Sequence, residues 1–585
     1  MSREPRITFD SFASEDYAST YSFAGFREVI TARSPEEVLP ALERIEEAVS
    51  RGLHAAGFIS YEAASALGQG LPTGNLAHFP LVWFALYERR FATTPPDLGA
   101  PNASEYSTSD WAPSVTEQEY GEAINSIREY IAAGDVYQVN FTLRHRFRFQ
   151  GDAYSFYRDL CRAQRAPFCA FIDTGDFQIL SVSPELFFDL HHGNLTARPM
   201  KGTAPRGKWH AHDEEIRENL KKGRKERAEN LMIVDLLRND MGKVSITGSV
   251  KVPSLFNVET LDTVHQMTST ITARLRPEAG IVELLRAMFP CGSITGAPKR
   301  RSMEIIEEME NSPRGLYTGC IGYISPKKEA LFSVAIRTIV IDTAAGTGEL
   351  GTGGGITWDS TAASEYEECL IKSRFAQEVR PDFQLIETLL YQEDEGYFLL
   401  ERHMARLYRS SNYFGFALRL GAVLDILNVR AQPLQGKHKV RVLLSRNGTF
   451  SVQTEQLPAG AEEHMAIVAL ADRPVDSRDP FLYHKTTNRP IYQRELERHP
   501  GCTDVIFCNE QGEVTEGARH NLVVNINGRM VTPPLAAGLL PGTFREELLA
   551  SQIVREKQVT VQELRSADDI FLINSVRKWR KAQLI

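Results

Sequence analysis

The sequence predicts two domains, each with a mixed α+β fold, and three observations support this prediction. The chain has 585 residues, which is too long for a single hydrophobic core. Short strand-like runs such as 56–61 alternate with helical patterns such as 35–49. The motifs change in character near residue 382. We therefore expect one domain over residues 1–378 and a second over residues 383–585.

Composition and charge exclude several classes of function. Hydrophobic residues make up 42% of the chain, charged residues make up 24%, and the net charge is −9. These values give no reason to expect a nucleic acid or an anionic membrane as a partner. The sequence has neither a signal peptide nor an apolar run that could span a bilayer. The seven cysteines lack a CxxC pair, which is typical of a reducing compartment. We expect a soluble, cytoplasmic protein.

Lys201 is the first candidate catalytic residue. It lies in the sequence ARPMKGT, where Pro199 and Gly202 predict an irregular and tightly positioned segment after the strand-like run 185–190. A lysine in a loop can equally be a solvated surface charge. The segments that follow decide between these two interpretations.

Two predicted helices each carry a pair of carboxylates on one face. Glu226 and Glu229 share a face with apolar residues of the first helix, and Glu365 and Glu368 are three residues apart on the second. Lys372 follows on the same face. A fraying helix end, or a surface pair of Glu368 with Lys372, would give the same pattern. If the carboxylates instead face a cavity, they suit a hard cation such as Mg²⁺.

Three further segments favour anion binding. Pro298 suits the first position of the helix 300–310, which would place Thr295 and nearby N–H groups at a positive helix end. Arg337 lies in a strand-like run, where a buried guanidinium needs an anion. The glycines 353–355 allow a ligand to approach the backbone closely, although a simple bulge has the same signature.

Taken together, residues 115–375 resemble the chorismate-utilising family, which includes anthranilate synthase and aminodeoxychorismate synthase. The motifs that carry the resemblance occur in the family's order, at 198–203, 229–236, 292–299, 314–319, 335–338 and 353–372. The resemblance implies an anthranilate-synthase-like chorismate-binding domain, a β-sandwich with surrounding helices.

Lys201 indicates which reaction of this family to expect. Anthranilate synthases carry Ala at this position, whereas a Lys is the mark of aminodeoxychorismate synthase, which aminates C4 of chorismate. A nucleophilic amine can displace the C4 hydroxyl by adding at C2, and ammonia can then attack C4 of the adduct. Glu185 matches the family's candidate general acid for the leaving hydroxyl.

The resemblance also assigns binding roles. Glu229 and Glu368, supported by Glu226 and Glu365, would hold Mg²⁺ against the ring carboxylate of the substrate. The remaining substrate-binding positions would be Tyr317 and Arg337 at the enolpyruvyl carboxylate, His265 near the ring, and Thr295, Gly296, Ala297, Gly354, Gly355 and Lys372 elsewhere. A purely structural histidine is the alternative at His265.

Residues 383–585 resemble class IV aminotransferases, which depend on pyridoxal 5′-phosphate (PLP), and their lyase relatives. The motifs lie at 399–407, 483–489, 514–522, 538–545 and 574–577. The resemblance implies a two-subdomain fold in which Lys485 forms the Schiff base with PLP and shuttles the proton. Glu516 would pair with the pyridine nitrogen. Arg406 and the backbone N–H groups of Thr543 and Phe544 would hold the phosphate.

The fusion of the two resemblances predicts consecutive reactions. The first domain would make 4-amino-4-deoxychorismate, and the second would release pyruvate from it to give 4-aminobenzoate for folate biosynthesis. An anthranilate-type synthase fused to an amino-acid transaminase is the alternative, which Lys201 argues against. A non-catalytic regulator is disfavoured because every proposed catalytic position is filled.

Partners follow from the same resemblance. No region remains for a glutaminase domain, so we expect a separate glutamine amidotransferase to supply ammonia. A homodimer through the second domain is expected from resemblance alone. Lys578 follows Arg577 where many class IV members have Gly, which leaves the substrate contacts at that end open.

Overall fold

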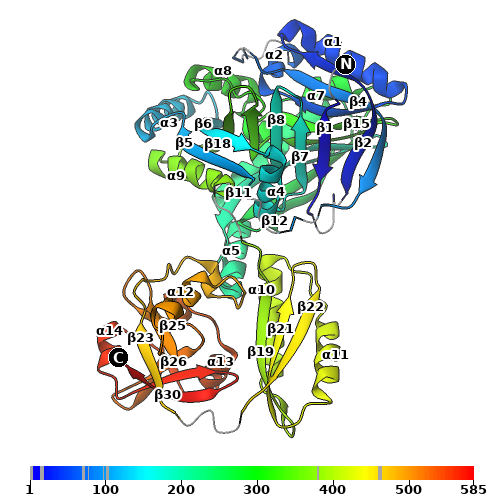
Figure 1. Ribbon diagram of the computed structural model, residues 1–585. Coiled ribbons are helices and arrows are strands. Elements are labelled where there is room, and N and C mark those ends of the chain that lie inside the picture. Colours follow the sequence, from blue (N-terminus) through cyan, green and yellow to red (C-terminus); the bar gives the residue numbers. More distant parts are fainter. Residues whose placement is uncertain are drawn as a thin grey trace. The chain divides into compact units, whose positions relative to one another are not determined.

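The computed structural model describes residues 4–13, 17, 19–68, 73–74, 76, 78–96, 98–99, 105–377, 381–458 and 464–585 (Figure 1). The chain forms two compact units. The first unit contains Met1–Pro205 and Arg217–Arg380, and the second contains Arg206–Ile216 and Pro381–Ile585. The second unit is therefore discontinuous in sequence.

The first unit is built on one long antiparallel ladder of strands. Its first half runs, in order of pairing, through β5 (Tyr106–Pro113), β6 (Gln138–Gly151), β18 (Thr347–Ile356), β17 (Thr338–Asp342), β8 (Phe177–Ser183), β7 (Phe168–Asp173) and β1 (Arg6–Asp10). Its second half continues through β2 (Thr20–Ala32), β4 (Val82–Thr93), β3 (His54–Ile59), β15 (Cys320–Ser325), β16 (Glu329–Val334), β9 (Leu186–His191), β10 (Asn194–Arg198) and β13 (Val264–Arg274). Strands β11 (Met200–Pro205) and β12 (Lys251–Thr260) both pair with β13, and β14 (Gly296–Ala297) pairs with β6.

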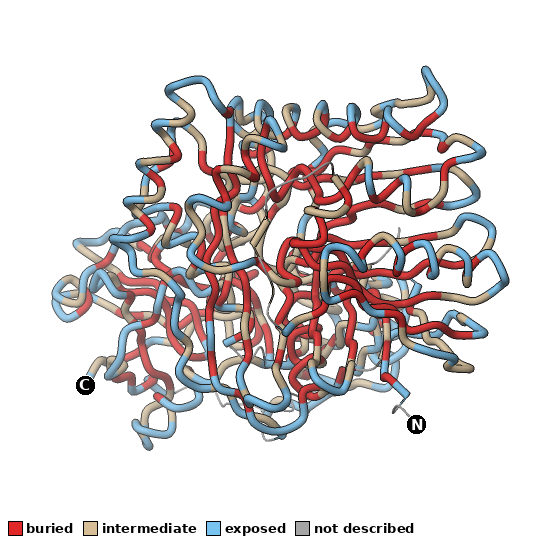
Figure 2. Tube along the Cα trace, turned by 90° about the horizontal axis from the view of Figure 1, so that it is seen from above, coloured by how far each residue is buried: buried red, intermediate tan, exposed pale blue. Residues whose placement is uncertain are grey.

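The two halves of the ladder face each other. Ile172 of β7 and Ile179 of β8 share one buried apolar cluster with Phe58 of β3 and Ile321 of β15. Buried segments follow the strands, whereas exposed segments lie at turns and on outer helix faces (Figure 2). This arrangement is a β-sandwich.

Helices cover the outer faces because each has an apolar stripe at helical spacing. In α1 (Pro35–Ser50) the stripe is Val38, Leu42, Ile45 and Val49. The other covering helices are α2 (Ala64–Leu67), α3 (Glu117–Ala132), α4 (Ala153–Gln164), α6 (Arg224–Gly242), α7 (Ile281–Met288), α8 (Lys299–Met309) and α9 (Ala362–Ser373). The β-sandwich with surrounding helices predicted from the sequence is confirmed.

Three local predictions need correction. Lys201 lies in strand β11, and the expected irregularity is a register shift between Met200 and Thr203 within that strand. Arg337 does not lie in a continuous strand. Its φ of 49° interrupts the extended backbone, so that β16 ends at Val334 and β17 begins at Thr338. Pro298 is the N-cap of α8, which begins one residue later, at Lys299.

The second unit contains two sheets, one for each subdomain. The smaller sheet has the order β20 (Gly396–Tyr397), β19 (Leu385–Gln392), β21 (Lys437–Leu444) and β22 (Phe450–Gln456), with α10 (Leu400–Phe414) and α11 (Leu420–Ala431). The larger has the order β25 (Val514–Gly517), β24 (Asp504–Cys508), β23 (Ala466–Leu470), β30 (Lys578–Leu584), β29 (Asp569–Asn574), β26 (Asn521–Ile526), β27 (Arg529–Thr532) and β28 (Arg555–Glu556), with α12 (Pro490–Arg498), α13 (Thr543–Ala550) and α14 (Val561–Arg565). The predicted two-subdomain fold is confirmed.

Residues 206–216, which include the first turns of α5 (His210–Lys222), belong to this second unit. In the part of the chain that the structure describes, no helix is both long enough and apolar enough to cross a membrane.

Gly57 is required by a close approach between β3 and β4. A Cβ atom at Gly57 would lie 2.0 Å from the carbonyl oxygen of Trp83. Gly57→Ala should therefore lower the free energy of unfolding of the first unit by about 2–3 kcal/mol, measured by urea titration. Gly242→Ala in α6 is the control, because a Cβ there meets nothing within 4 Å. Equal stability of the two variants would contradict this account.

Candidate active sites

Lys201 is held on an irregular strand and is half-buried. Its backbone carbonyl accepts a hydrogen bond from the amide of Asn230 on α6 at 3.4 Å, and Ser269 of β13 donates to the same amide at 2.5 Å. Burial lowers the pKa of the Lys201 amine, and the carboxylates of Glu229 and Glu185 oppose this shift. A neutral amine is the form that can act as a nucleophile.

Glu185 lies beside Lys201, in the link between β8 and β9. One carboxyl oxygen accepts a hydrogen bond from the backbone N–H of Met200 at 3.4 Å. Burial raises the pKa of Glu185 to about 7, against the opposing effects of the Ser293 hydroxyl and of Lys201. A carboxyl group with this pKa can donate a proton near neutral pH. The geometry therefore brings a proton donor next to the amine.

The four predicted metal ligands gather on α6 and α9 at the same site. Burial raises the pKa values of Glu229 and Glu365, and each of these carboxylates interacts electrostatically with its neighbours on both helices. Glu226 is half-buried and Glu368 is exposed. Among the described residues, no three of these four carboxylates bring oxygen atoms within 4.8 Å of one another. The four carboxylates therefore form an open arrangement rather than a closed set of metal ligands.

Gly355 on β18 forms one wall of the site. A Cβ atom there would lie 3.1 Å from the Lys201 amine and 1.7 Å from the amide nitrogen of Gln138. At Gly354 a Cβ would lie 2.8 Å from a carboxylate oxygen of Glu365. These glycines therefore provide close approach to functional side chains rather than a simple bulge.

Gln138 is a site residue that sequence reasoning missed. It is 1% exposed, and neither atom of its side-chain amide has a hydrogen-bond partner among the described residues. A buried amide without a partner is uncommon and marks a place where a ligand or water completes the bonding. The only sequence signal is its position in GDVYQVN, at the start of strand β6.

Several predicted substrate-binding residues are held by the protein itself. His265 is fully buried and bonds the Thr260 hydroxyl at 3.1 Å, which keeps a structural role open. The Thr295 hydroxyl donates to backbone carbonyls, and Gly296 and Ala297 pair with β6. Strand pairing with β6 therefore fixes the loop that leads into α8.

Lys372 forms the surface ion pair with Glu368 that the sequence analysis gave as an alternative. It also makes a second contact, with the backbone of β18. Its amine lies 2.6 Å from the Glu368 carboxylate and donates to the Gly353 carbonyl at 2.8 Å. The surface ion pair is therefore present, and the role of Lys372 in binding a substrate stays a prediction.

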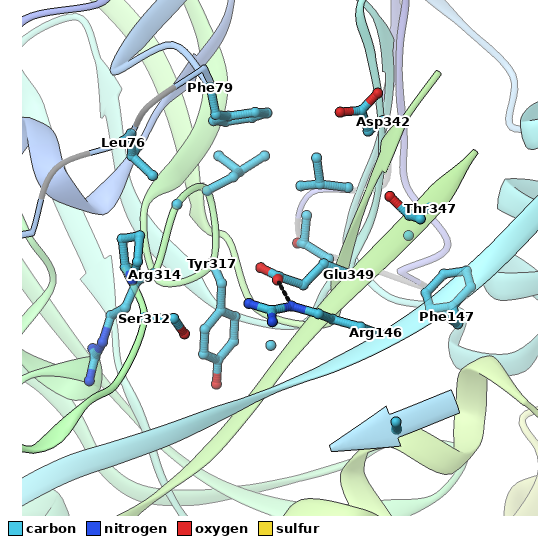
Figure 3. Close-up of a pocket in the computed structure, with 18 of the residues that line it drawn as sticks. Leu76, Phe79, Arg146, Phe147, Ser312, Arg314, Tyr317, Asp342, Thr347 and Glu349 are labelled. Atoms are coloured by element: carbon cyan, nitrogen blue, oxygen red, sulfur yellow. Dashed lines mark hydrogen bonds and ion pairs between the residues drawn. The ribbon is translucent and has the colours of Figure 1, made fainter. Parts of the chain in front are cut away.

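Tyr317 lies at a separate cavity of about 520 Å³ in the first unit. Figure 3 shows Tyr317 near the hydrogen-bonded pair of Arg146 and Glu349. The Tyr317 ring lies over Gly351, four residues along β18 from Gly355, which is roughly 13 Å at the usual rise of a strand. The Tyr317 ring therefore packs on β18 at Gly351, whereas the Lys201 amine lies beside Gly355 on the same strand.

Arg337 is also held by a neutral partner. Its guanidinium donates to the side-chain carbonyl of Gln164, at the end of α4. The anion expected from the sequence is therefore not the partner of this contact.

The second unit brings its predicted cofactor residues together in one cavity of about 530 Å³. Arg406, Lys485, Glu516, Thr543 and Phe544 all line it. The cavity lies between the two subdomains, because α10 and β19 supply one wall while β25, β26 and α13 supply the other.

Arg406 is fixed by a buried carboxylate. Its guanidinium donates to both oxygens of Glu387, at 2.9 and 2.7 Å. Burial acts to raise the pKa of Glu387, but Arg406 and His403 hold it at about 2. The first N–H groups of α13, at Thr543 and Phe544, have no partners within the helix and line the same cavity. Together they form a site for an anion such as a phosphate.

Lys485 and Glu516 have shifted pKa values for the same physical reason. Burial and the nearby cations Arg489 and Arg406 lower the pKa of Lys485 to about 7. Burial raises the pKa of Glu516 to about 7. Its carboxyl oxygens accept hydrogen bonds from Tyr492 and Asn521, each at 2.9 Å. A buried amine that is neutral near pH 7 suits covalent attachment of a carbonyl cofactor.

Sequence reasoning missed most of the residues that hold this second site. Glu387, His403, Arg489 and Tyr492 stabilise the predicted residues, and Lys439, Arg441 and Arg577 make the rest of the cavity cationic. His403, Arg489, Asn521 and Arg577 lay in motifs that signalled the family, although their individual roles were not assigned.

Comparison with known families agrees with these two sites. The family described as chorismate binding enzyme matches residues 4–378, and the family described as class IV amino-transferase matches residues 384–585. The chain therefore belongs to the chorismate binding enzyme family, and it carries a class IV aminotransferase domain after that match.

Relatives of the first unit include two named synthases. Aminodeoxychorismate synthase component 1 of Salmonella typhimurium is 46% identical over 267 residues, 45% of this chain and 58% of that protein. Anthranilate synthase component 1 of Aquifex aeolicus is 38% identical over 265 residues, 45% of this chain and 53% of that protein. The chain thus spans little more than half the length of these relatives.

Among solved structures, anthranilate synthase component I of Streptococcus pneumoniae is similar. It has a TM-score of 0.53 and 26% identity, over 61% of this chain and 92% of that one. This likeness agrees with the sandwich described above.

Gly355→Ala tests the wall of the first site. The added methyl group would overlap the Gln138 amide and press against the Lys201 amine. We expect any reaction that uses the Lys201 amine at this site to slow at least ~100-fold in the variant, because small misplacements of catalytic groups have effects of this size. Gly121→Ala is the control, since its Cβ would make an ordinary 3.4 Å contact. Full activity of Gly355→Ala would show that the substrate does not use this wall.

Proposed function

We propose that the chain makes 4-aminobenzoate in two steps. The first unit converts chorismate and ammonia into 4-amino-4-deoxychorismate and water. The second unit splits that product into 4-aminobenzoate and pyruvate. The observation that carries the first step is the enclosed Lys201 amine beside the protonatable Glu185. The second step rests on the convergence of Lys485, Glu516 and Arg406 in one cavity.

In the first step Lys201 acts as a nucleophile. Its neutral amine adds at C2 of the ring, the C4–O bond breaks, and Glu185 gives its proton to the departing hydroxyl, which leaves as water. Ammonia then adds at C4, and Lys201 leaves C2 as its bond electrons return to the amine. Burial favours the neutral forms of both Lys201 and Glu185 at the start of this sequence.

Mg²⁺ fits the carboxylates on α6 and α9. This ion keeps several waters and uses only one or two carboxylates of the protein, together with substrate oxygens. An open group of four glutamates suits such a hydrated ion better than a closed cage would. Glu229 and Glu368 would hold it, with Glu226 and Glu365 in support. Bound there, the ion would neutralise the ring carboxylate of the substrate.

The other substrate contacts follow from the same placement. Tyr317 and Arg337 are proposed to bind the enolpyruvyl carboxylate, the latter by exchanging its contact with Gln164. Lys372 and the backbone of Gly354 would contact the ring side. The remaining proposed contacts are those of His265, Thr295, Gly296, Ala297 and Gly355.

PLP fits the cavity of the second unit. Arg406 and the N–H groups of Thr543 and Phe544 would hold its phosphate, and Glu516 would face its pyridine nitrogen. When bound, PLP supplies an electron sink for the bond changes next to the substrate nitrogen. Lys485 holds the cofactor covalently and moves the proton between substrate atoms. The cationic side chains of Lys439, Arg441 and Arg577 would bind the two carboxylates of the substrate.

A separate glutamine amidotransferase is proposed as the ammonia source. The relative from Salmonella is named component 1, which supports a second component for this chain too. The seven free cysteines are in keeping with a reducing, cytoplasmic location. A homodimer through the second unit remains a proposal that sedimentation of the full chain would test.

Product analysis tests the proposed function directly. The purified chain is mixed with chorismate, ammonium, Mg²⁺ and PLP, and the products are separated by chromatography. The proposal expects 4-aminobenzoate and pyruvate in equal amounts. Formation of 2-aminobenzoate would overturn the first step, and accumulation of 4-amino-4-deoxychorismate would overturn the second.

Lys201→Ala and Lys485→Ala should separate the two reactions. Loss of a nucleophile typically costs several orders of magnitude in rate, so we expect each variant to lose its own step by at least ~10³-fold. Lys201→Ala should keep PLP binding and should convert added 4-amino-4-deoxychorismate normally. Lys485→Ala should accumulate that intermediate from chorismate. Efficient 4-aminobenzoate production by Lys485→Ala would refute the lyase assignment.

The first step should lose rate as pH rises. The protonated form of Glu185 is the active one, and its pKa of about 7 keeps it protonated up to neutral pH. At a constant concentration of free ammonia, and over the pH range in which Lys201 is already neutral, the rate should therefore decline above pH 7 rather than above the ordinary carboxyl pKa. Glu185→Gln should remove this decline along with most of the rate. A wild-type profile that is flat from pH 6 to pH 9 would contradict the role of Glu185.

A further inference from the structure

Residues 206–216, here called the strap, form a closed loop within the second unit. The guanidinium of Arg206 donates to both oxygens of Asp213, at 2.9 and 2.8 Å, and both side chains are about 95% buried. The backbone N–H of Gly207 donates to the same carboxylate at 2.7 Å. A bidentate, buried pair of this kind fixes its partners in one geometry.

The strap holds the end of helix α10. Arg206 donates to the carbonyl of Tyr413 at 2.8 Å, and its guanidinium lies 4.2 Å from the centre of the Tyr413 ring. In return, the Tyr413 hydroxyl donates to the carbonyl of Gly207 at 2.7 Å. Helix α10 is the element that also carries Arg406.

Trp209 extends the contacts of the strap to the residues around Tyr483. Its ring centre lies 5.3 Å from that of Tyr483, and it packs against the buried cluster that contains Tyr483 and Tyr492. Tyr492 is the residue whose hydroxyl donates to Glu516. The strap therefore contacts residues on two sides of the proposed PLP site.

His484 lies between these contacts and directly precedes Lys485. Its ring centre is 4.3 Å from that of Tyr413, and one ring nitrogen bonds the Ser410 hydroxyl at 2.9 Å. Burial and the Arg206 guanidinium lower the pKa of His484 to about 3, so its ring stays neutral. On the following residue, the carbonyl of Lys485 accepts a hydrogen bond from the backbone N–H of Ile386 at 2.8 Å.

We propose that the strap is a positioning element for Lys485. It fixes Tyr413, His484 and Tyr483 from the side opposite the cavity, and so keeps the backbone of Lys485 in place and water away from it. The residues that do this are Arg206, Asp213 and Trp209, which none of the site motifs contains. The proposal rests on the proposed role of Lys485 in binding PLP.

Loss of the strap has a specific chemical consequence. The amine of Lys485 has a low pKa chiefly because it is buried. Water that enters beside His484 would stabilise the ammonium form and return the pKa toward the ordinary value. A strap that only added general stability would change the unfolding temperature without moving the titration of Lys485.

The test uses the full-length chain without PLP and measures acylation of Lys485 by mass spectrometry as a function of pH. In the wild type the midpoint should lie near 7, against an ordinary value of 10.5. Trp209→Ala and Arg206→Ala should raise it by at least one pH unit and weaken PLP binding at least 10-fold. Trp209→Phe, which keeps an aromatic contact, should stay near the wild type. Glu215→Ala, on the exposed side of the strap, is the matched control.

The outcomes separate the two proposals. An unchanged midpoint and unchanged PLP affinity in a folded Trp209→Ala variant would overturn the positioning role. If Trp209→Ala does not fold, Arg206→Lys decides, because Lys keeps the charge but loses the bidentate geometry and should give an intermediate shift. A wild-type chain that binds no PLP would instead overturn the proposed function, and the Lys485 midpoint would still report on the strap.

Discussion

Each unit must hold one half-buried lysine amine where its pKa is lowered, and much of the surrounding structure follows from that constraint. An ammonium ion is costly to bury, so the amine tends toward its neutral, nucleophilic form. Lys201 is enclosed between β11 and the glycine-lined wall of β18, and Lys485 between two subdomains. In both places nearby carboxylates oppose the lowering of the lysine pKa but do not cancel it.

The two units meet this constraint in different ways. In the first, Glu185 is itself buried and carries its own proton, so amine and acid can both be neutral. In the second, the carboxylate of Glu387 is committed to Arg406 and His403. Burial and the cations Arg489 and Arg406 lower the pKa of Lys485, and Glu387 and Glu516 oppose them only in part. The proposed function therefore gives the same kind of residue two different tasks, addition to a ring carbon in one unit and attachment of a cofactor in the other.

The sequence identified the candidate catalytic residues but not the residues that hold them in place. Lys201, Lys485 and Glu516 lie in motifs whose residue types the chemistry dictates, and the fold class follows from the same motifs. Gln138 escaped notice because its importance depends on which residue β18 places opposite it. Arg337 was assigned to a strand because its neighbours are β-branched, whereas a positive φ breaks the strand there. The membership of 206–216 in the second unit depends on packing with residues about 200 positions away, which no local pattern encodes.

The discontinuity of the second unit bears on how the chain is made. During synthesis, residues 206–216 emerge long before the rest of their own unit, since Pro381–Ile585 is translated later. At typical rates of about 5–20 residues per second, Trp209 waits roughly 20–70 s for its partners on the ribosome. The first unit must therefore fold while its sequence is interrupted by a segment that belongs to the second unit. If the first unit buried that segment, the second unit would lack part of its interior. Trp209 must therefore stay available until the second unit folds, which constrains the order of folding.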